Sequence, residues 1–434
     1  MTIVDSERAE AHLRALAERE LRRAPTSDRL VGTVNAVAHA LVMAGALDTV
    51  VGRLVIEDLD LALDTRRPKP PAPRPGPRGI RRWPVTTAPS SRPVPVPPRL
   101  AAAGLSMPIP DGSLHVLAYA RTRHGAHFIV VARTAASEPL DGFTATDAAG
   151  TSYELTFSGG GSSHVWTGEL AIHPDPPPDL RWLEIAGPGA PGRRVDLTSG
   201  PAPDCLTTPV PPSPGEHLLH IVAADLLGHL PEFPPEERRA MAAKRQQPSF
   251  YASLGQIAAA LRAAGALSPD SPVPGQLAAV CEAVGIDDHG LTPSGQDLPE
   301  PWASVLAGYQ RAGPAEQPPD GCAGIALTLP EADGIVLSIL GLHNADGASM
   351  LHVHASGVLP WQVRGSAEPM PLIWLRDSAG HWHVTRSGGG GSELDGELTM
   401  RLKVVPPLSR PDWIEVVVCG RSGEMRVTVP LRWG

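Results

Sequence analysis

Four histidines near the C-terminal end have the type and spacing of metal ligands. One residue separates His352 from His354, and one separates His381 from His383. On a β-strand, residues i and i+2 project from the same face, so each pair would present two imidazoles together. Imidazole nitrogens are ligands that zinc and other borderline metals accept readily. One hypothesis is therefore a metal-dependent enzyme or metal sensor that binds zinc through these four side chains.

Two glycine runs are the second candidate for function. Neither has the lysine and the fixed spacing of a phosphate-binding loop. Glycine adopts positive φ easily, but it loses more conformational entropy than other residues when it is fixed. We expect each run to form a mobile hairpin loop, and a loop that becomes ordered on a partner is the functional alternative. The glycines that would make these binding loops are Gly159, Gly160, Gly161, Gly388, Gly389, Gly390 and Gly391.

Nucleophilic catalysis has little support in the sequence. The chain has no G-x-S-x-G motif, in which a serine nucleophile stands on a sharp turn. Its four cysteines, Cys205, Cys281, Cys322 and Cys419, form no C-x-x-C pair and have no zinc-type spacing to histidine. Isolated cysteines of this kind suit a reducing compartment. We therefore predict no catalytic residues and no organic cofactor.

The elements that must position these residues occur twice along the chain. Residues 105–134 align with residues 327–356 without a gap, at a shift of 222, and an Asp-x-Ala-Gly turn and a glycine run follow in both halves. Such a long period indicates a duplicated multi-element unit rather than a solenoid. In this alignment Val130 and Ala132 stand where the second half has His352 and His354, so the fold itself would not require histidine there.

Each copy is predicted to combine a small helical module with an antiparallel β-sandwich. Residues 105–198 and 327–434 consist of short alternating or apolar runs between glycine and proline turns, which is typical of strands. Their number and length fit a sandwich of the immunoglobulin size class, although the Cys…Trp…Cys framework is absent. We expect Trp182 and Trp413 to anchor the two cores, because aromatic side chains bury the most area. The predicted class is α+β multidomain, a tandem duplication joined by Pro-rich linkers.

The domain boundaries follow from composition and periodicity. Apolar residues at helical spacing predict helices over residues 5–24, 29–44 and 50–63. Proline-dense stretches without such a pattern predict extended polyproline-II linkers. The predicted segments are helical module 1 (1–65), a Pro/Arg-rich linker (66–104), β-sandwich 1 (105–198), a linker (199–214), helical module 2 (215–310), a linker (311–326) and β-sandwich 2 (327–434).

Charge and hydropathy restrict the partners. The net charge is −9, and the cations between residues 66 and 99 leave the rest of the chain more acidic. An acidic folded body argues against nucleic acid, which needs clustered cations. No apolar run approaches the ~20 residues of a membrane span, and no signal peptide is evident at the N-terminus. We expect no membrane partner and a cytoplasmic location.

These observations favour a non-catalytic intracellular protein-interaction or scaffold protein with an unidentified protein partner. Two copies of a module on extended linkers would favour bivalent engagement of that partner. The metal-dependent enzyme or sensor remains the alternative. The sequence leaves open whether the two β-regions pack on each other or stay apart.

Overall fold

The chain forms two compact units, and each unit draws on both halves of the sequence. We analysed a computed structural model. It describes residues 4–23, 28–64, 94–109, 111–134, 141–161, 164–198, 204–208, 213–228, 250–286, 289–293, 295–311, 319–357, 371–394 and 396–434. Unit 1 consists of residues 1–91, 212–299 and 361–370, and unit 2 of residues 92–211, 300–360 and 371–434. The helical modules of both halves therefore belong to one unit and the sheets of both halves to the other.

Unit 1 is helical. Helices α2 and α6 contact each other, so the two helical modules share a core. Each ends at a glycine in the left-handed region, Gly45 (φ 65°) and Gly265 (φ 69°), which is the usual C-terminal arrangement of a helix. The elements described in this unit are α1 (Ser6–Arg23), α2 (Asp28–Met43), α3 (Thr49–Asp64), α4 (Pro214–Gly228), the 3-10 helix η1 (Phe250–Ser253), α6 (Leu254–Ala263) and α7 (Val273–Val284).

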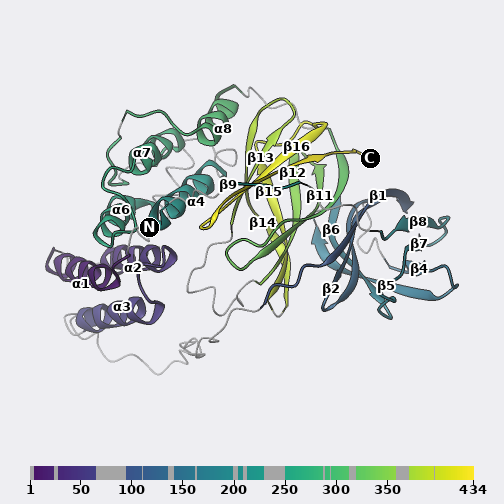
Figure 1. Cartoon of the computed structure of the whole chain (residues 1–434), viewed down its shortest axis with the longest axis horizontal. Coiled ribbons are helices and arrows are strands. Elements are labelled where there is room, and N and C mark those ends of the chain that lie inside the picture. Colours follow the sequence, from purple (N-terminus) through teal and green to yellow (C-terminus); the bar gives the residue numbers. More distant parts are fainter. Residues whose placement is uncertain are drawn as a thin grey trace, which may run out of the picture. The chain divides into compact units, whose positions relative to one another are not determined.

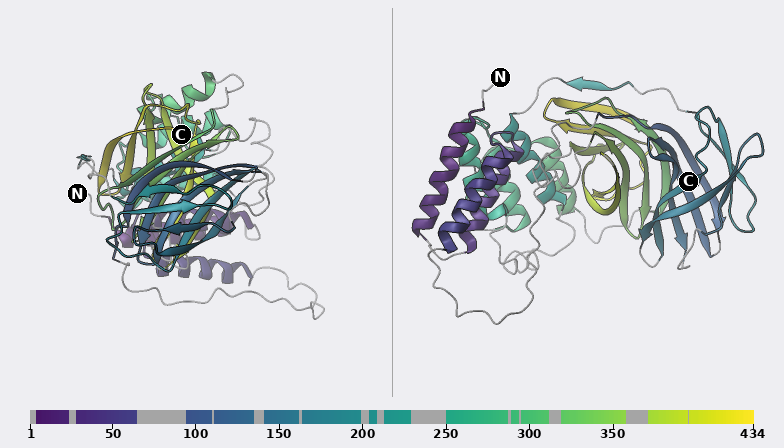
Figure 2. Two further views of the ribbon diagram at one scale, coloured as in Figure 1. Left: turned by 90° about the vertical axis from the view of Figure 1, so that its right-hand side faces the viewer. Right: turned by 90° about the horizontal axis from the view of Figure 1, so that it is seen from below.

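Sheet A, the first sheet of unit 2, is an antiparallel sheet that nearly closes into a barrel (Figures 1 and 2). Its strand order is β1-β2-β3-β6-β5-β4-β7-β8. The two edge strands, β1 and β8, contact each other, and side chains such as Phe128, Val130 and Leu183 fill the interior. The strands are β1 (Arg99–Ile109), β2 (Gly112–Thr122), β3 (Gly125–Thr134), β4 (Thr144–Thr146), β5 (Ser152–Gly161), β6 (Val165–His173), β7 (Trp182–Ala186) and β8 (Arg193–Asp196).

Sheet B, the second sheet of unit 2, curves into a half-barrel (Figure 1). Its order is β10-β11-β12-β15-β14-β13-β16-β17-β9, and helix α8 (Glu300–Arg311) packs against β14. The strands are β9 (Leu206–Thr208), β10 (Gly321–Thr328), β11 (Val336–Ala345), β12 (Ala348–Ser356), β13 (Leu372–Asp377), β14 (Trp382–Leu394), β15 (Glu397–Val405), β16 (Trp413–Gly420) and β17 (Gly423–Pro430).

The two sheets have the same strand order over their first eight positions, and their registers match in detail. In sheet A a bulge in β2 precedes the pair Ala118↔Ile129. In sheet B a bulge in β11 precedes the pair Gly341↔His352. The equivalent positions in β3 and β12 are therefore 223 residues apart, not 222. Because a one-residue change of register exchanges the two faces of a strand, this difference decides where the histidines point.

This register corrects the expected counterparts of the histidine pair. The residue that matches His352 is Ile129, and the residue that matches His354 is Val131. The ungapped alignment had instead chosen Val130 and Ala132, whose side chains lie in the interior of sheet A. The alignment was wrong by one position because the connection between β10 and β11 is one residue longer than that between β1 and β2: Leu105 pairs with Val116, whereas Leu327 pairs with Ile339.

The β-regions differ from a two-layer immunoglobulin-like sandwich. Each is one continuous hydrogen-bonded sheet, and sheet A encloses its own core by curling. The expected core anchors, Trp182 and Trp413, are only partly buried, and the guanidinium of Arg194 lies 4.7 Å from the centre of the Trp182 ring. Neither tryptophan is therefore a fully buried core anchor.

The predicted linkers are shorter in the structure or lie outside the described residues. Strand β1 begins at Arg99, inside the segment 66–104, and β10 begins at Gly321, inside the segment 311–326. In the segment 199–214 the structure describes β9, which pairs with β17. The proline-rich residues 66–93 and the remaining parts of these segments, 199–203, 209–212 and 312–318, lie outside the described residues.

The outer faces of the two sheets pack against each other. Leu117 and Ile129 from sheet A and Leu340 from sheet B belong to one apolar cluster. The backbones approach closely here, because a Cβ atom on Gly324 of β10 would lie 2.3 Å from the carbonyl oxygen of Leu117. Unit 2 is thus a sheet-on-sheet body, and this face positions the site described next.

Candidate functional site

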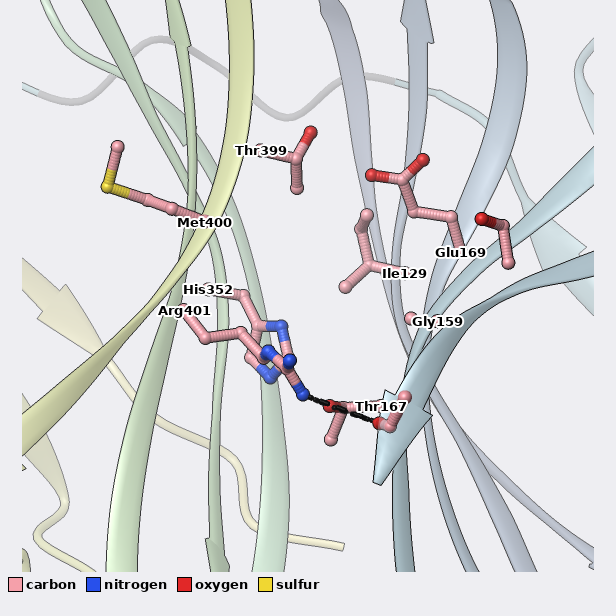
Figure 3. A pocket seen from close by; sticks show the side chains of 11 residues that line it. Ile129, Gly159, Thr167, Glu169, His352, Thr399, Met400 and Arg401 are labelled. Carbon is pink, nitrogen blue, oxygen red and sulfur yellow. Dashed lines mark hydrogen bonds between the residues drawn. The ribbon is translucent and has the colours of Figure 1, made fainter. Parts of the chain in front are cut away.

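A pocket of about 330 Å³ lies between the two sheets. Figure 3 shows side chains from sheet A and sheet B facing one another across it. The pocket contains two of the glycines and one of the histidines that the sequence had singled out. Its lining residues are Ile129, Ser158, Gly159, Gly160, Thr167, Gly168, Glu169, His352, Thr399, Met400 and Arg401.

On the sheet B wall, His352 of β12 pairs with Arg401 of β15, and Thr399 of β15 pairs with His354, which does not itself line the pocket. His352 is buried, and its Nε2 lies 2.8 Å from Nδ1 of His343, so one imidazole donates a hydrogen bond to the other. Burial lowers the pKa of His352 well below its ordinary value, and the neighbouring His343 and Arg401 lower it further. His352 is therefore neutral at physiological pH and offers a hydrogen bond rather than a charge.

On the sheet A wall, Ile129 of β3 pairs with Glu169 of β6, and Thr167 of β6 pairs with Val131, which does not itself line the pocket. These positions are equivalent to the two pairs of sheet B. Thr167 thus corresponds to Thr399, and Glu169 corresponds to Arg401. The pocket therefore lies at a place where matching positions of the two sheets meet, with a carboxylate on one side and a guanidinium on the other.

The first glycine run completes the sheet A wall and is part of a strand rather than a loop. Gly159 pairs with Gly168 and Gly160 with Thr167, both within the β5–β6 hairpin. A Cβ atom on Gly159 would lie 2.4 Å from the carbonyl oxygen of Thr167, whereas one on Gly160 would meet nothing within 4 Å. Close packing therefore requires glycine at 159, while Gly160 leaves open space in the pocket.

The second glycine run is also part of a strand. Gly388, Gly389, Gly390 and Gly391 lie on β14, where the register with β15 shifts between Ser387 and Gly391. The expectation of mobile loops at both runs is thus replaced by strand segments. Periodicity alone could not reveal this, because glycine has no side chain that alternates between faces.

Arg401 is the most distinctive group of the site. Its Nη1 donates hydrogen bonds to Oγ1 of Thr167 and to the carbonyl oxygen of Gly160, 3.5 Å away. Both acceptors are neutral. Among the described residues no ion pair joins this partly buried guanidinium to a carboxylate, and burial lowers its pKa. Partial removal of a cation from water costs free energy unless a counter-charge is near, so the pocket favours an anionic group near Arg401.

Ion pairs close the rim of the contact between the sheets. Nε of Arg123 lies 3.4 Å from Oε1 of the buried Glu397, and Arg133 pairs with Asp320. Each of these pairs therefore links sheet A to sheet B.

The four histidines of the metal hypothesis do not come together. β15 separates β12 from β14, so His352 and His354 lie two strands away from His383. Nδ1 of His383 donates a hydrogen bond to the carbonyl oxygen of Pro406 at 2.6 Å, and the exposed His381 contacts Asp377. In the described parts of the chain no group of three or more histidine, cysteine, aspartate or glutamate side chains could hold a metal ion.

The thiols are poorly suited to nucleophilic chemistry. Burial raises the pKa of Cys281, Cys322 and Cys419 to about 12 in each case. Since the thiolate is the reactive form, these groups remain protonated and unreactive near neutral pH.

A second cavity, of about 480 Å³, lies in unit 1 between α1 and the segment around α6. It is lined by His12 and Arg19 on α1 and by Gly255 and Gln256 on α6. Burial lowers the pKa of His12, and the charge of Arg19 lowers it further. It contains none of the residues that the sequence had indicated, so the pocket of unit 2 is the stronger candidate.

Comparison of the chain with protein-family models, curated proteins and solved structures finds no match. Of the helices that the structure describes, none has the length and apolar character needed to cross a membrane. The assignment of a function therefore depends on the geometry of the site alone.

Proposed function

We propose that the chain is a non-catalytic intracellular binding protein, built from two copies of a helix-plus-sheet unit, whose binding site is the pocket between the sheets. The observation that carries this proposal is the convergence of equivalent positions. Ile129 and His352, Thr167 and Thr399, and Glu169 and Arg401 all line the same pocket. A cavity in which both copies contribute matching positions is a single composite site.

The identical strand orders and matching bulges of the two sheets support the duplication. The packing of the sheets changes how the copies would act. Two modules on flexible tethers would bind two sites on a partner, and their linkage would set the effective concentration. Sheets that share an apolar face instead form one body, so we propose one shared site rather than bivalent engagement.

The chemistry of the site supports binding more than catalysis. The histidines at and beside the pocket are neutral, and the pKa of His343 is lowered to about 3, first by burial and then by nearby arginines. General acid–base catalysis works best with a pKa near the operating pH, which these groups lack. The mixed polar and apolar lining instead resembles the composition of ligand pockets in general.

The test is to fill the pocket without disturbing the strand. Gly160→Leu places a side chain where no atom lies within 4 Å of the Cβ position, and Gly434→Leu at the exposed C-terminal residue is the matched control. Tagged wild type and both variants are recovered from the source cells, and bound proteins and small molecules are quantified by mass spectrometry.

We expect Gly160→Leu to reduce recovery of a specific bound species by at least ~10-fold, with Gly434→Leu unchanged. Equal recovery by wild type and Gly160→Leu would contradict a binding role for this pocket.

A further inference from the structure

The pocket has two chemically different ends. Figure 3 shows Arg401 pointing to Thr167, with His352 beside it, and Glu169 pointing towards Thr399, with Ile129 beside it. Each charged residue thus reaches towards the threonine of the opposite sheet. Because Arg401 and Glu169 occupy equivalent positions, the two ends have the same layout and opposite charge.

The Arg401 end is suited to an oxyanion. The guanidinium has planar, fixed donors that match a carboxylate or phosphate, and its hydrogen-bond acceptors in the structure are a hydroxyl and a backbone carbonyl. His352 adds a neutral imidazole at the adjacent cross-strand position. An anion that took the place of Thr167 Oγ1 as the hydrogen-bond acceptor would neutralise the charge of the partly buried Arg401 guanidinium.

The Glu169 end is suited to the opposite charge. Its carboxylate accepts hydrogen bonds, and the hydroxyls of Ser158 and Thr399 line the same end of the pocket. Ser158 pairs with Glu169 across the β5–β6 ladder, which places its side chain on the same face. A ligand with two anionic groups would meet repulsion at Glu169, and a ligand with two cationic groups would meet repulsion at Arg401.

We propose that the pocket binds a small zwitterionic ligand, an aminocarboxylate or similar molecule, with its oxyanion at Arg401 and its ammonium group at Glu169. This inference rests on the proposed function, since it names the ligand class of that same site. The size of the pocket, about 330 Å³, allows a small molecule and no folded domain.

The test uses probes that differ in charge but little in length. Isothermal titration calorimetry of the full chain would measure binding of β-alanine, γ-aminobutyrate, δ-aminovalerate and ε-aminocaproate, with glutarate and cadaverine as the dianionic and dicationic controls. We expect at least one aminocarboxylate to bind, and both controls to bind at least ~10-fold more weakly.

Two variants then test which end of the pocket binds the oxyanion of the ligand and which end binds its ammonium group. Arg401→Gln should weaken the aminocarboxylate at least ~10-fold, and Glu169→Gln should do the same while strengthening glutarate. The gain for glutarate cannot come from misfolding, and thermal unfolding of both variants checks that they are folded.

The inference is overturned if none of the four aminocarboxylates binds at about 10 mM, a concentration that reveals even weak complexes. It is equally overturned if binding is the same in Arg401→Gln. If recovery from cells still depends on Gly160 while no aminocarboxylate binds, the proposed function stands and the zwitterion assignment fails. If the aminocarboxylate binds as described but recovery from cells does not depend on Gly160, the pocket binds zwitterions and the species recovered from cells binds elsewhere on the chain.

Discussion

Acidification should destabilise unit 2, because histidines are buried without charge between its sheets. The pKa of His354 is lowered to about 4 by burial, with smaller contributions from His127 and His124. The pKa of His343 is lowered to about 3 by burial, with contributions from Arg401, Arg133 and His115. In the unfolded chain both imidazoles titrate near their ordinary pKa of about 6.5.

The sign follows from which state binds the proton. Between pH 6.5 and 4 the unfolded chain takes up protons at these imidazoles and the folded chain does not, so the free energy of unfolding falls as pH falls. Each group contributes ~1.4 kcal/mol per pH unit in this window. From pH 7 to pH 5, His343 and His354 together should remove about 4 kcal/mol, a large part of a typical stability of 5–15 kcal/mol.

The variant that isolates this effect is His354→Val, because Val131 occupies the equivalent position of sheet A. Urea unfolding at pH 7, 6 and 5, followed by tryptophan fluorescence, should show about 2 kcal/mol less destabilisation at pH 5 than in wild type. His164→Gln, at an exposed histidine, is the control and should behave as wild type. If the stabilities of wild type and His354→Val decline in parallel, the histidine burial described here does not govern the acid response.

Three further outcomes test other contacts. Gly324→Val should lower stability by ~1–3 kcal/mol through overpacking, because its Cβ would clash with the carbonyl oxygen of Leu117; a thermal scan that matches wild type would contradict the close approach of the sheets. Asp377→Asn should cost ~1–2 kcal/mol at pH 7. Burial alone would raise the pKa of Asp377, but hydrogen bonds from His383 and the backbone N–H of His381 lower it to about 2. This stabilisation is present above pH ~4 and is lost as pH falls towards 2, so the difference between wild type and variant, measured by denaturant titration, should shrink in acid; a constant difference would count against it. Iodoacetamide should label the buried thiols of Cys281 and Cys322 slowly at pH 7 in the folded chain and rapidly in urea, as followed by mass spectrometry. Rapid labelling of the folded chain would show that these thiols are accessible.

Local patterns predicted the elements well. Helices α1, α2 and α3 occur where apolar periodicity placed them, and the turns at Asp147 and Asp377 have the same geometry, with each Oδ1 accepting two backbone N–H bonds. These features depend on a few neighbouring residues, which the sequence displays directly.

Only some of the residues that line the candidate site could be predicted from the sequence. His352, Gly159 and Gly160 were selected by type, but Arg401, Thr167 and Glu169 were not, because nothing local marks them. Alternation along β6 and β15 could have suggested that Thr167 and Glu169, and likewise Thr399 and Arg401, share a face. Their meeting across the sheets depends on pairings between residues more than 230 positions apart, which no local pattern encodes.

The opposite charges of Glu169 and Arg401 have a consequence for evolution. In a symmetric dimer of identical chains, every position at the shared face must carry the same residue twice. In one polypeptide that restriction does not apply, so positions that match in the two sheets can carry different residues, as Glu169 and Arg401 do. The pocket is therefore not symmetric, and an asymmetric molecule of the proposed kind would bind in it in a single orientation.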